Sequence, residues 1–270
     1  KNIILTATEG LTMQDWLISP TNGRNKNVLL IGGPGTGKTR FFVLPNLLQM
    51  YGSYVVTDPK GTILPDIGDL LLKGGYKIKV LNLKELDKSM HYNPLSYLKT
   101  ELDVLKFANM LTTATKAADE KEDFWVKAER LLYSAVLGLI IFEGNEKEKN
   151  IDTLIQIIDA SKTSENDETF ENAVDMLFND IAEQKPDCFA VRQYKKYKLA
   201  AGKSAKSVLL CCGVRLSPFD IKEIRELTSQ KDELELDKLG EEKTALFVIT
   251  SDTDSTLNFL AAFLYMQMFN

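Results

Sequence analysis

The sequence predicts an α/β fold with a mainly parallel sheet, interrupted by an all-α domain. Short apolar runs alternate with helix-like segments over residues 1–100, which is typical of parallel strands joined by right-handed crossovers. Strand-like runs are then missing over residues 101–229, where apolar residues recur at helical spacing. A continuous apolar run at Thr244–Thr250 predicts that a buried strand follows.

Residues 1–100 divide into five expected elements. They are strand 28–31, helix 40–50, strand 53–57, helix 62–73 and strand 76–81. Pro45 should kink the first helix or end its first segment, because proline cannot donate a backbone hydrogen bond. Gly74 and Gly75 are expected to end the second helix.

The rest of the chain sets the predicted domain boundaries. One face of a helix is indicated by Leu102, Leu105, Phe107 and Leu111. A second is indicated by the same kind of spacing at Trp125, Ala128, Leu131, Leu132 and Ala135. After the strand at Thr244–Thr250, residues 257–269 form an apolar, helix-like run. We therefore expect an α/β domain built from residues 1–100 and 230–270, incomplete at its C-terminal end, with an all-α domain over residues 101–229.

The most informative motif is Gly-Gly-Pro-Gly-Thr-Gly-Lys-Thr at residues 32–39, which matches G-x-x-x-x-G-K-[ST] directly after a predicted strand. Glycines let such a loop turn tightly and direct its N–H groups at phosphate oxygens. Lys38 can reach the β- and γ-phosphates, the Thr39 hydroxyl is suited to Mg²⁺, and both are the candidate catalytic residues. The candidate ATP-binding residues are Gly32, Gly33, Pro34, Gly35, Thr36, Gly37, Lys38, Thr39 and Arg40. A glycine-rich turn without a ligand is the alternative interpretation.

Two aspartates follow predicted strands and are candidates for a role near the metal. Asp58 ends the strand at residues 53–57, where it could hold Mg²⁺ or its waters, or could simply form the turn before Pro59. Asp252 follows the strand at Thr244–Thr250, and an ordinary loop role is the favoured interpretation for it.

The composition is that of an ordinary globular protein, with 44% hydrophobic and 26% charged residues and a net charge of −5. The spacing of Cys188, Cys211 and Cys212 fits no zinc motif and favours reduced thiols. His91 is the only histidine, and it cannot by itself build a metal site or a Ser-His-Asp triad.

A basic segment lies between Asp187 and Asp220, with Tyr194 and Tyr197 interleaved. Basic residues with aromatic neighbours can follow a nucleic-acid backbone, whereas a solvated helix face is the alternative interpretation. The candidate DNA-binding residues are Arg192, Lys195, Lys196, Lys198, Lys203 and Lys206, and Arg215 lies in the same interval.

No segment of the sequence is apolar over the length of a membrane span, and no signal peptide is expected. The longest apolar stretch, at residues 131–142, is interrupted by Ser134 and Gly138. The chain begins with Lys and stops directly after an apolar run, so we expect a trimmed, cytoplasmic domain of a longer protein.

Several segments in a fixed order carry a resemblance to one family. They are Asn27–Arg40 with Pro45-Asn46, Val55–Gly61, Asn93-Pro94-Leu95, Phe124-Trp125 with Ala128-Glu129, and Leu246–Phe269. Together they are similar to the type IV coupling proteins, the TraG/TraD-like ATPases of conjugation and type IV secretion, which are related to the FtsK/HerA DNA pumps. The last segment resembles the Gram-positive branch, and the resemblance covers nearly the whole chain.

This resemblance implies a RecA-like nucleotide-binding domain that carries an all-α domain, in a protein that forms a homo-hexamer at the cytoplasmic face of the bacterial cell membrane. It implies ATP and Mg²⁺ as cofactors, and DNA, a relaxase and the channel proteins of type IV secretion as partners. Members of the family reach the membrane through a segment that this sequence lacks. ATP hydrolysis would drive DNA transfer through the ring.

The sequence departs from the family in two places. Thr62 stands where the family often has Glu after the Asp-x-Lys-Gly motif, and the Walker B Asp-Glu pair normally lies beyond the point where this chain stops. We therefore expect the chain to bind nucleotide and to hydrolyse it poorly.

Two further functions remain open from the sequence. The helical domain could act mainly as a receptor for relaxase or effector proteins, with the ATPase secondary. The chain could also be an unrelated P-loop NTPase, acting as a switch or as a small-molecule kinase.

Overall fold

The structure, a computed structural model, describes residues 2–13, 25–115, 124–161, 171–201 and 204–269. Its contacts divide the chain into two compact units. The first comprises Lys1–Val80 and Lys238–Asp252, and the second comprises Leu81–Asp237 and Thr253–Asn270. This division differs from the predicted one, because the second unit begins before residue 101 and takes up the C-terminal end of the chain.

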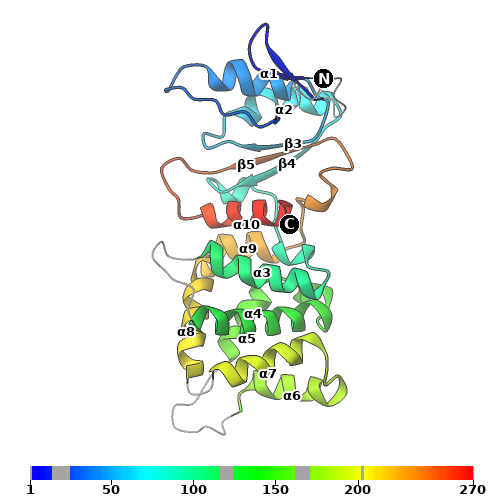
Figure 1. The fold of residues 1–270 in the computed structure, drawn as a ribbon, viewed down its shortest axis with the longest axis vertical. Helices are drawn as coiled ribbons and strands as arrows, with labels where there is room; N and C mark the ends of the chain where they lie inside the picture. The colour runs from blue at the N-terminus through cyan, green and yellow to red at the C-terminus, as the bar shows by residue number, and fades with distance from the viewer. Residues whose placement is uncertain (1, 14–24, 116–123, 162–170, 202–203, 270) are drawn as a thin grey trace. The chain divides into compact units, whose positions relative to one another are not determined.

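The first unit contains a three-stranded sheet with the order β3-β5-β4 (Figure 1). The strands are β3 (Tyr54–Thr57), β4 (Lys77–Asn82) and β5 (Thr244–Ile249), so the strands predicted at 53–57, 76–81 and 244–250 are confirmed. β3 and β5 run parallel, with Val56 opposite Phe247. Every residue of β5 is buried, as its continuous apolar run predicts for a central strand.

Helices α1 (Leu44–Leu47) and α2 (Ile63–Lys73) lie on one side of this sheet (Figure 1). Their apolar side chains share a core with the strands, made of Leu47, Val56, Ile63, Ile67, Leu71, Tyr76, Ala245 and Phe247. Gly74 ends α2, and Gly75 follows with a left-handed backbone, φ 79°, so the predicted glycine stop is confirmed.

The strand predicted at Val28–Ile31 is wrong. The segment pairs with no strand among the described residues, and Leu29 and Ile31 are 85% and 87% exposed. The centre of the sheet is occupied by β5, which lies between β3 and β4. Four apolar residues become a strand only where a neighbour accepts their backbone hydrogen bonds, and here none does.

The helix predicted at residues 40–50 is shorter and begins differently. A π-helical turn, η2 (Thr39–Val43), precedes α1, and the Leu44 N–H bonds to the Thr39 carbonyl. Pro45 lies at the start of α1 and has no N–H to continue the ladder of the preceding turn. The predicted break at Pro45 is therefore present, and Met50 with φ 52° follows the end of α1.

A hairpin of β1 (Asn2–Ile4) and β2 (Gly10–Thr12) was not expected from the sequence. It is held to α1 by Asn46, whose side chain accepts from the Ile4 N–H at 2.8 Å and donates to the Ile4 carbonyl at 2.9 Å. This small antiparallel sheet thereby supports the helix that follows the glycine-rich loop.

The second unit is helical, which confirms the helical character predicted for residues 101–229. Its helices are α3 (Glu101–Ala114), α4 (Phe124–Phe142), α5 (Ile151–Ala160), α6 (Ala173–Gln184), α7 (Phe189–Ala201), α8 (Ala205–Leu216), α9 (Lys222–Ser229) and α10 (Asn258–Phe269). Short 3₁₀ turns lie at Leu86–Lys88, Pro94–Tyr97, Glu146–Glu148, Ser217–Asp220 and Leu236–Lys238. α4 is apolar on nearly all sides and is buried against α3, α5, α7 and α8.

α10 belongs to this second unit, although we expected residues 253–270 to complete the α/β domain. Phe263 packs on Phe107 of α3 with ring centroids 5.4 Å apart, and the Gln267 amide donates to the Pro94 carbonyl at 2.7 Å. The helix is apolar on several faces, so it buries itself where aromatic partners are available.

None of the helices in the described ranges combines the length and the apolar character that a membrane span requires.

Candidate functional site

The glycine-rich loop at residues 32–38 lies at the surface of the first unit, between the extended segment 28–31 and η2. Gly35 and Gly37 have left-handed backbone, with φ 75° and 82°. Residues with a side chain rarely adopt this conformation, so glycine is required at both positions. Loops that alternate right- and left-handed residues in this way form concave anion sites lined by backbone N–H groups.

Close packing within the loop adds a second reason for glycine. A Cβ on Gly37 would lie 2.6 Å from the Cε2 atom of Phe41, and a Cβ on Gly32 would lie 2.7 Å from the Thr36 hydroxyl oxygen. Gly33 has open space around it. The loop conformation and packing therefore require glycine at residues 32, 35 and 37, whereas residue 33 has space for a side chain.

Lys38 closes the loop through its side chain. Its ammonium donates to the carbonyl oxygens of Gly32 at 2.5 Å and Gly33 at 2.8 Å, and the Thr36 hydroxyl donates to the Gly33 carbonyl at 2.9 Å. Carbonyl oxygens accept from an ammonium as phosphate oxygens do, but carry no full charge. The loop therefore holds the Lys38 ammonium over its own backbone, and a bound phosphate could replace the two carbonyl oxygens as its acceptor.

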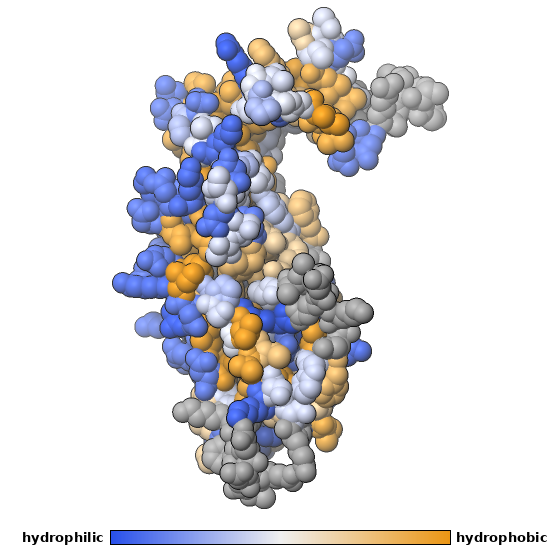
Figure 2. Space-filling view, turned by 90° about the vertical axis from the view of Figure 1, so that its left-hand side faces the viewer, coloured by the Kyte–Doolittle hydropathy of each residue, from blue (hydrophilic) through white to orange (hydrophobic). Residues whose placement is uncertain are grey.

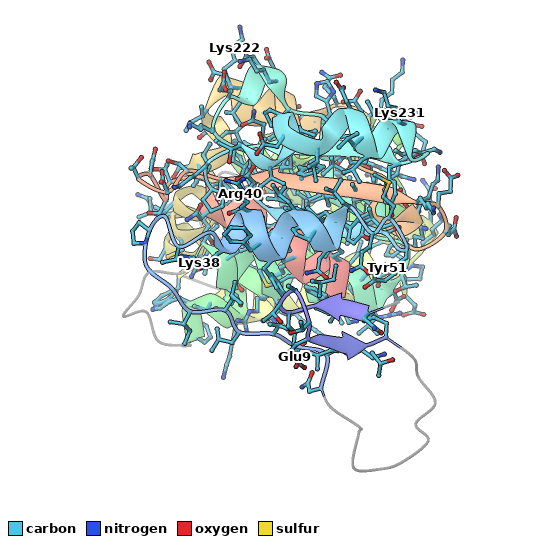
Figure 3. The ribbon with its side chains drawn as sticks, turned by 90° about the horizontal axis from the view of Figure 1, so that it is seen from above. Glu9, Lys38, Arg40, Tyr51, Lys222 and Lys231 are labelled. Carbon is cyan, nitrogen blue, oxygen red and sulfur yellow. The ribbon has the colours of Figure 1, made fainter. Side chains whose placement is uncertain are left out.

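Thr39 and Arg40 continue from the loop into η2, and both are exposed. Lys38 and Arg40 lie at the loop end of the helical segment, and Tyr51 lies beyond its other end (Figure 3). The Arg40 guanidinium stacks over the Phe41 ring at 5.7 Å. Lysine, threonine hydroxyl and arginine are thus gathered at the start of one helical segment.

Asp58 follows β3 and is 2% exposed. Its carboxylate accepts from the Ile63 N–H at 2.7 Å and from the Lys60 N–H at 3.3 Å, and so it caps the turn into α2. Gly61 in this turn has φ 70°, and a Cβ there would lie 3.3 Å from Ile249. This geometry supports the turn-forming interpretation of Asp58, while its place after β3 keeps it near the carboxyl end of the sheet.

Asp252 is exposed and lies after β5 in the first unit.

Cys188, Cys211 and Cys212 are free thiols, and burial raises the pKa of the Cys212 thiol. Within the described ranges no cluster of three or more His, Cys, Asp and Glu side chains forms a metal site.

The predicted DNA-binding residues lie in the second unit, mostly on α7 and α8. Arg192 pairs with Glu101 at 3.2 Å, and Lys198 pairs with Asp175 at 2.8 Å. Lys195, Lys196 and Lys206 are exposed, while Lys203 lies outside the described residues.

The aromatic part of that prediction is wrong. Tyr194 and Tyr197 are 7% and 3% exposed, so neither ring is open to a base. Tyr194 stacks on Phe178 with centroids 3.9 Å apart, and its hydroxyl donates to Asp175. Both tyrosines lie on the inner face of an amphipathic helix, and the spacing of α7 turns the lysines outward instead.

Arg215 also turns inward rather than toward solvent. It is 6% exposed, pairs with the buried Glu129 and donates to the Thr112 carbonyl at 3.2 Å. The outer face of α8 carries Leu210 and Val214, which are 70% and 65% exposed. On the side of the second unit where α8 lies, hydrophobic and hydrophilic patches alternate on the surface (Figure 2).

Two residues that support the loop were missed from the sequence. Phe41 covers Gly37 from the next helical turn, and Asn46 ties α1 to the hairpin. In the sequence, Pro45-Asn46 contributes to the family resemblance but does not by itself indicate the bond from Asn46 to the hairpin. An asparagine inside an otherwise apolar helix is the signal that could have indicated a structural hydrogen bond.

The comparisons with known proteins agree with this architecture. The sequence profile of the family T4SS-DNA_transf, described as "Type IV secretory system Conjugative DNA transfer", matches residues 2–270. The chain is also similar to a solved structure titled "Bacterial conjugative coupling protein TrwBdeltaN70. Unbound monoclinic form", with 16% identity and a TM-score of 0.50. No match was found among curated proteins.

The structural match covers 85% of this chain and 47% of the other, so this chain spans about half the length of that protein. At this identity the match shows the fold alone, and it confirms the predicted RecA-like α/β fold with an all-α interruption. Since the family profile covers essentially the whole chain, the protein belongs to the family of type IV secretory system conjugative DNA transfer proteins.

Proposed function

We propose that this chain is the ATP-binding part of a conjugative coupling protein, and that residues 32–40 bind the phosphates of ATP. The observation that carries the proposal is the conformation of the loop. Gly35 and Gly37 take the left-handed backbone that a phosphate-binding nest needs, and Lys38 folds over the same backbone. A turn without a ligand would not need a lysine held at that place.

On ATP binding, Lys38 exchanges the Gly32 and Gly33 carbonyls for β- and γ-phosphate oxygens, which attract it more strongly because they are charged. The start of η2 adds the positive end of a helical segment. Mg²⁺, when bound, would neutralise phosphate charge. The Thr39 hydroxyl is its proposed ligand, and Asp58 is the proposed partner of the metal or of its waters. Because Asp58 already accepts two backbone N–H groups, we assign it to a water of the metal rather than to the metal itself.

The activity of the whole protein is part of the same proposal. Membership of a conjugative DNA transfer family and similarity to a protein titled a conjugative coupling protein support a motor that moves DNA by hydrolysing ATP. Its proposed partners are DNA, a relaxase and the type IV secretion channel, in a homo-hexamer at the cytoplasmic face of the membrane. Lys195, Lys196 and Lys206, which are exposed, remain proposed DNA contacts together with Arg192 and Lys198.

Slow turnover is expected from this chain. Of the two acids that follow β3 and β5, Asp58 is tied to the turn before α2 and Asp252 is exposed. Phosphoryl transfer to water depends on a group that orients the attacking water, and neither carboxylate is committed to that role.

The test is calorimetric titration of the chain with Mg-ATP, followed by phosphate release under the same conditions. Lys38→Ala should weaken ATP binding at least about 10-fold, since a hydrogen bond to a charged group contributes roughly 1.5–3 kcal/mol. The matched control is Lys73→Ala, which removes an exposed lysine of the same unit at the far end of α2.

Equal ATP affinity of the Lys38→Ala variant and the native chain would overturn the assignment of the loop. Rapid phosphate release by the native chain would instead promote Asp58 or Asp252 to a direct role in hydrolysis. Substitution of each by Asn would then identify which of them acts.

A further inference from the structure

The second unit contains a cavity of about 670 Å³ that the proposed function does not use. It lies where the turn before α5, the segment 93–99 and the segment after α9 meet. The lining residues are Asn93, Leu95, Ser96, Leu98, Lys99, Glu146, Lys147, Lys149, Asn150, Ser229, Gln230, Lys231 and Asp232. Its volume is within the range of roughly 300–1,000 Å³ that small-molecule sites occupy.

Positive charge dominates the lining, although the chain as a whole has a net charge of −5. Four lysines face two acids there. Lys149 pairs with Glu146 at 2.5 Å, and the carboxylate of Asp232 accepts from the Asn93 N–H at 3.0 Å. Both acids therefore have partners of their own.

Two of the four lysines are uncommitted. Lys147 and Lys231 are exposed, and neither has a carboxylate partner within the described ranges. The hydroxyl of Ser229, which also lines the cavity, has no hydrogen-bond partner among the described residues. Cations and a hydroxyl donor without acceptors are the groups that an anion would satisfy.

The backbone that carries these lysines is held in place. The Asn93 amide donates to the Lys149 carbonyl at 2.8 Å, and the Asn150 amide donates to the Lys147 carbonyl at 2.7 Å. Asn150 is also the N-cap of α5, accepting from the Thr153 N–H at 3.0 Å, so the positive end of that helix adjoins the cavity. The turn at residues 146–150 is thus a fixed support rather than a free loop.

We propose that this cavity binds phosphate groups, from a nucleic-acid strand or from a free polyphosphate. Lysine is a compact point charge that suits phosphate, and the described lining holds four lysines and no arginine. The described lining also carries no aromatic ring. We therefore expect a nucleic-acid strand to contact it through the phosphate backbone, without base stacking.

As a contact for a DNA strand, the site deepens the DNA-handling part of the proposed function, and it is independent of ATP binding at residues 32–40. Binding of a fluorescent oligodeoxythymidine is measured over a series of salt concentrations, with inorganic tripolyphosphate and polyglutamate as competitors. The test variant is Lys147→Gln with Lys231→Gln. The control variant is Lys73→Gln with Lys127→Gln, which removes the same charge at two exposed lysines outside the cavity.

The test variant should bind the oligonucleotide more weakly, with a slope of log affinity against log salt that is lower by roughly 0.7 for each lysine that no longer neutralises a phosphate. The control variant should keep the native slope. A preference for tripolyphosphate over the oligonucleotide, lost in the test variant, would identify a free polyphosphate as the source. Equal slopes for the two variants, or competition by polyglutamate as strong as by tripolyphosphate, would overturn the proposal.

Folding and the ATP site are checked separately. Both test lysines are exposed, so the thermal unfolding midpoint of the test variant should match that of the control. Lys38→Ala should leave oligonucleotide binding intact, so loss of ATP binding and loss of phosphate binding in the cavity are distinguished.

Discussion

The Lys38 ammonium donates to the Gly33 carbonyl at 2.8 Å, so the lysine of the glycine-rich loop is bonded to the loop itself. The same ammonium also reaches the Gly32 carbonyl at 2.5 Å. Both acceptors are neutral and exposed, and each bond to them is therefore weaker than one to a charged phosphate oxygen. If a triphosphate binds at this loop as proposed, it replaces these contacts with stronger ones.

The dependence on phosphate gives the first prediction. Lys38→Met removes the charge but keeps an unbranched side chain, and it should weaken ATP binding at least about 10-fold while leaving adenosine binding unchanged, because hydrogen bonds to charged groups contribute roughly 1.5–3 kcal/mol. Calorimetric titration with each ligand measures the difference. Equal loss for ATP and adenosine would show that Lys38 shapes the site rather than contacting phosphate.

The second prediction uses two glycines of the same loop. Gly37→Ala places a side chain on a residue with φ 82°, with its Cβ 2.6 Å from the Phe41 Cε2 atom. It should therefore abolish tight ATP binding and lower the unfolding free energy by about 1–3 kcal/mol. Gly33→Ala is the matched control for stability, because a Cβ there has no atom within 4 Å. Urea unfolding of both variants and ATP titration of Gly37→Ala test this, and equal stability of the two variants would contradict the observed loop conformation.

How far the sequence predicts this structure depends on how local each signal is. β5 was predictable because a continuous apolar run bounded by charged residues is read within the run itself. The turn conformation of the glycine-rich loop was predictable because the left-handed backbone of Gly35 and Gly37 depends on the loop alone. In both cases the residues that determine the local structure lie within the segment itself.

The failures have non-local causes. Val28–Ile31 is as apolar as a strand, but strand formation needs a partner, and the order β3-β5-β4 leaves it none among the described residues. Tyr194 and Tyr197 were expected beside a DNA backbone. Tyr194 is buried against Phe178 and Asp175 of another helix, and Tyr197 packs on Tyr194. α10 packs with the second unit, which the sequence did not indicate because its aromatic partners lie far away in the sequence.

Asp58 provides a third prediction, which separates its two roles. Asp58→Ala leaves the Ile63 and Lys60 N–H groups without their acceptor and should lower the unfolding free energy by roughly 1–3 kcal/mol. Asp58→Asn keeps one oxygen acceptor and should cost less. If Asp58 also holds a water of Mg²⁺, Asp58→Asn will reduce the gain in ATP affinity that Mg²⁺ provides. An unchanged gain in ATP affinity would show that Asp58 only stabilises the turn before α2.

The fourth prediction concerns the ion pair of Glu129 on α4 with Arg215 on α8, both of which are buried. Removing one partner leaves an uncompensated buried charge, so Glu129→Leu should destabilise the chain by about 3–5 kcal/mol. The double variant Glu129→Leu with Arg215→Met should recover much of this loss, because an apolar pair of similar volume avoids the cost of desolvation. Urea unfolding of the native chain and of the two variants measures the recovery, and equal loss in the single and double variants would show that the pair acts only through its separate hydrogen bonds.

Asp175 gives the last prediction, a dependence of stability on pH. Burial alone would raise the pKa of its carboxyl, but the Lys198 ammonium at 2.8 Å, the Asn172 N–H and the Tyr194 hydroxyl outweigh burial and hold the pKa below its usual value of 3.8. Because the folded-state pKa lies below the unfolded value, Asp175 stabilises the fold above that value, and this contribution is lost as the pH falls through the folded-state pKa.

Asp175→Asn should therefore lower the unfolding free energy at neutral pH. The difference in unfolding free energy between this variant and the native chain should become smaller once the pH falls below about 3.8. Urea unfolding of both proteins across this pH range measures the two curves. Asp152→Asn is a suitable control because Asp152 also pairs with an arginine of the same unit, at 3.4 Å, while its carboxyl makes no bond to a buried tyrosine. A constant difference between the native chain and Asp175→Asn at every pH would mean that the carboxylate charge does not stabilise α6 against α7, and that its hydrogen bonds alone do.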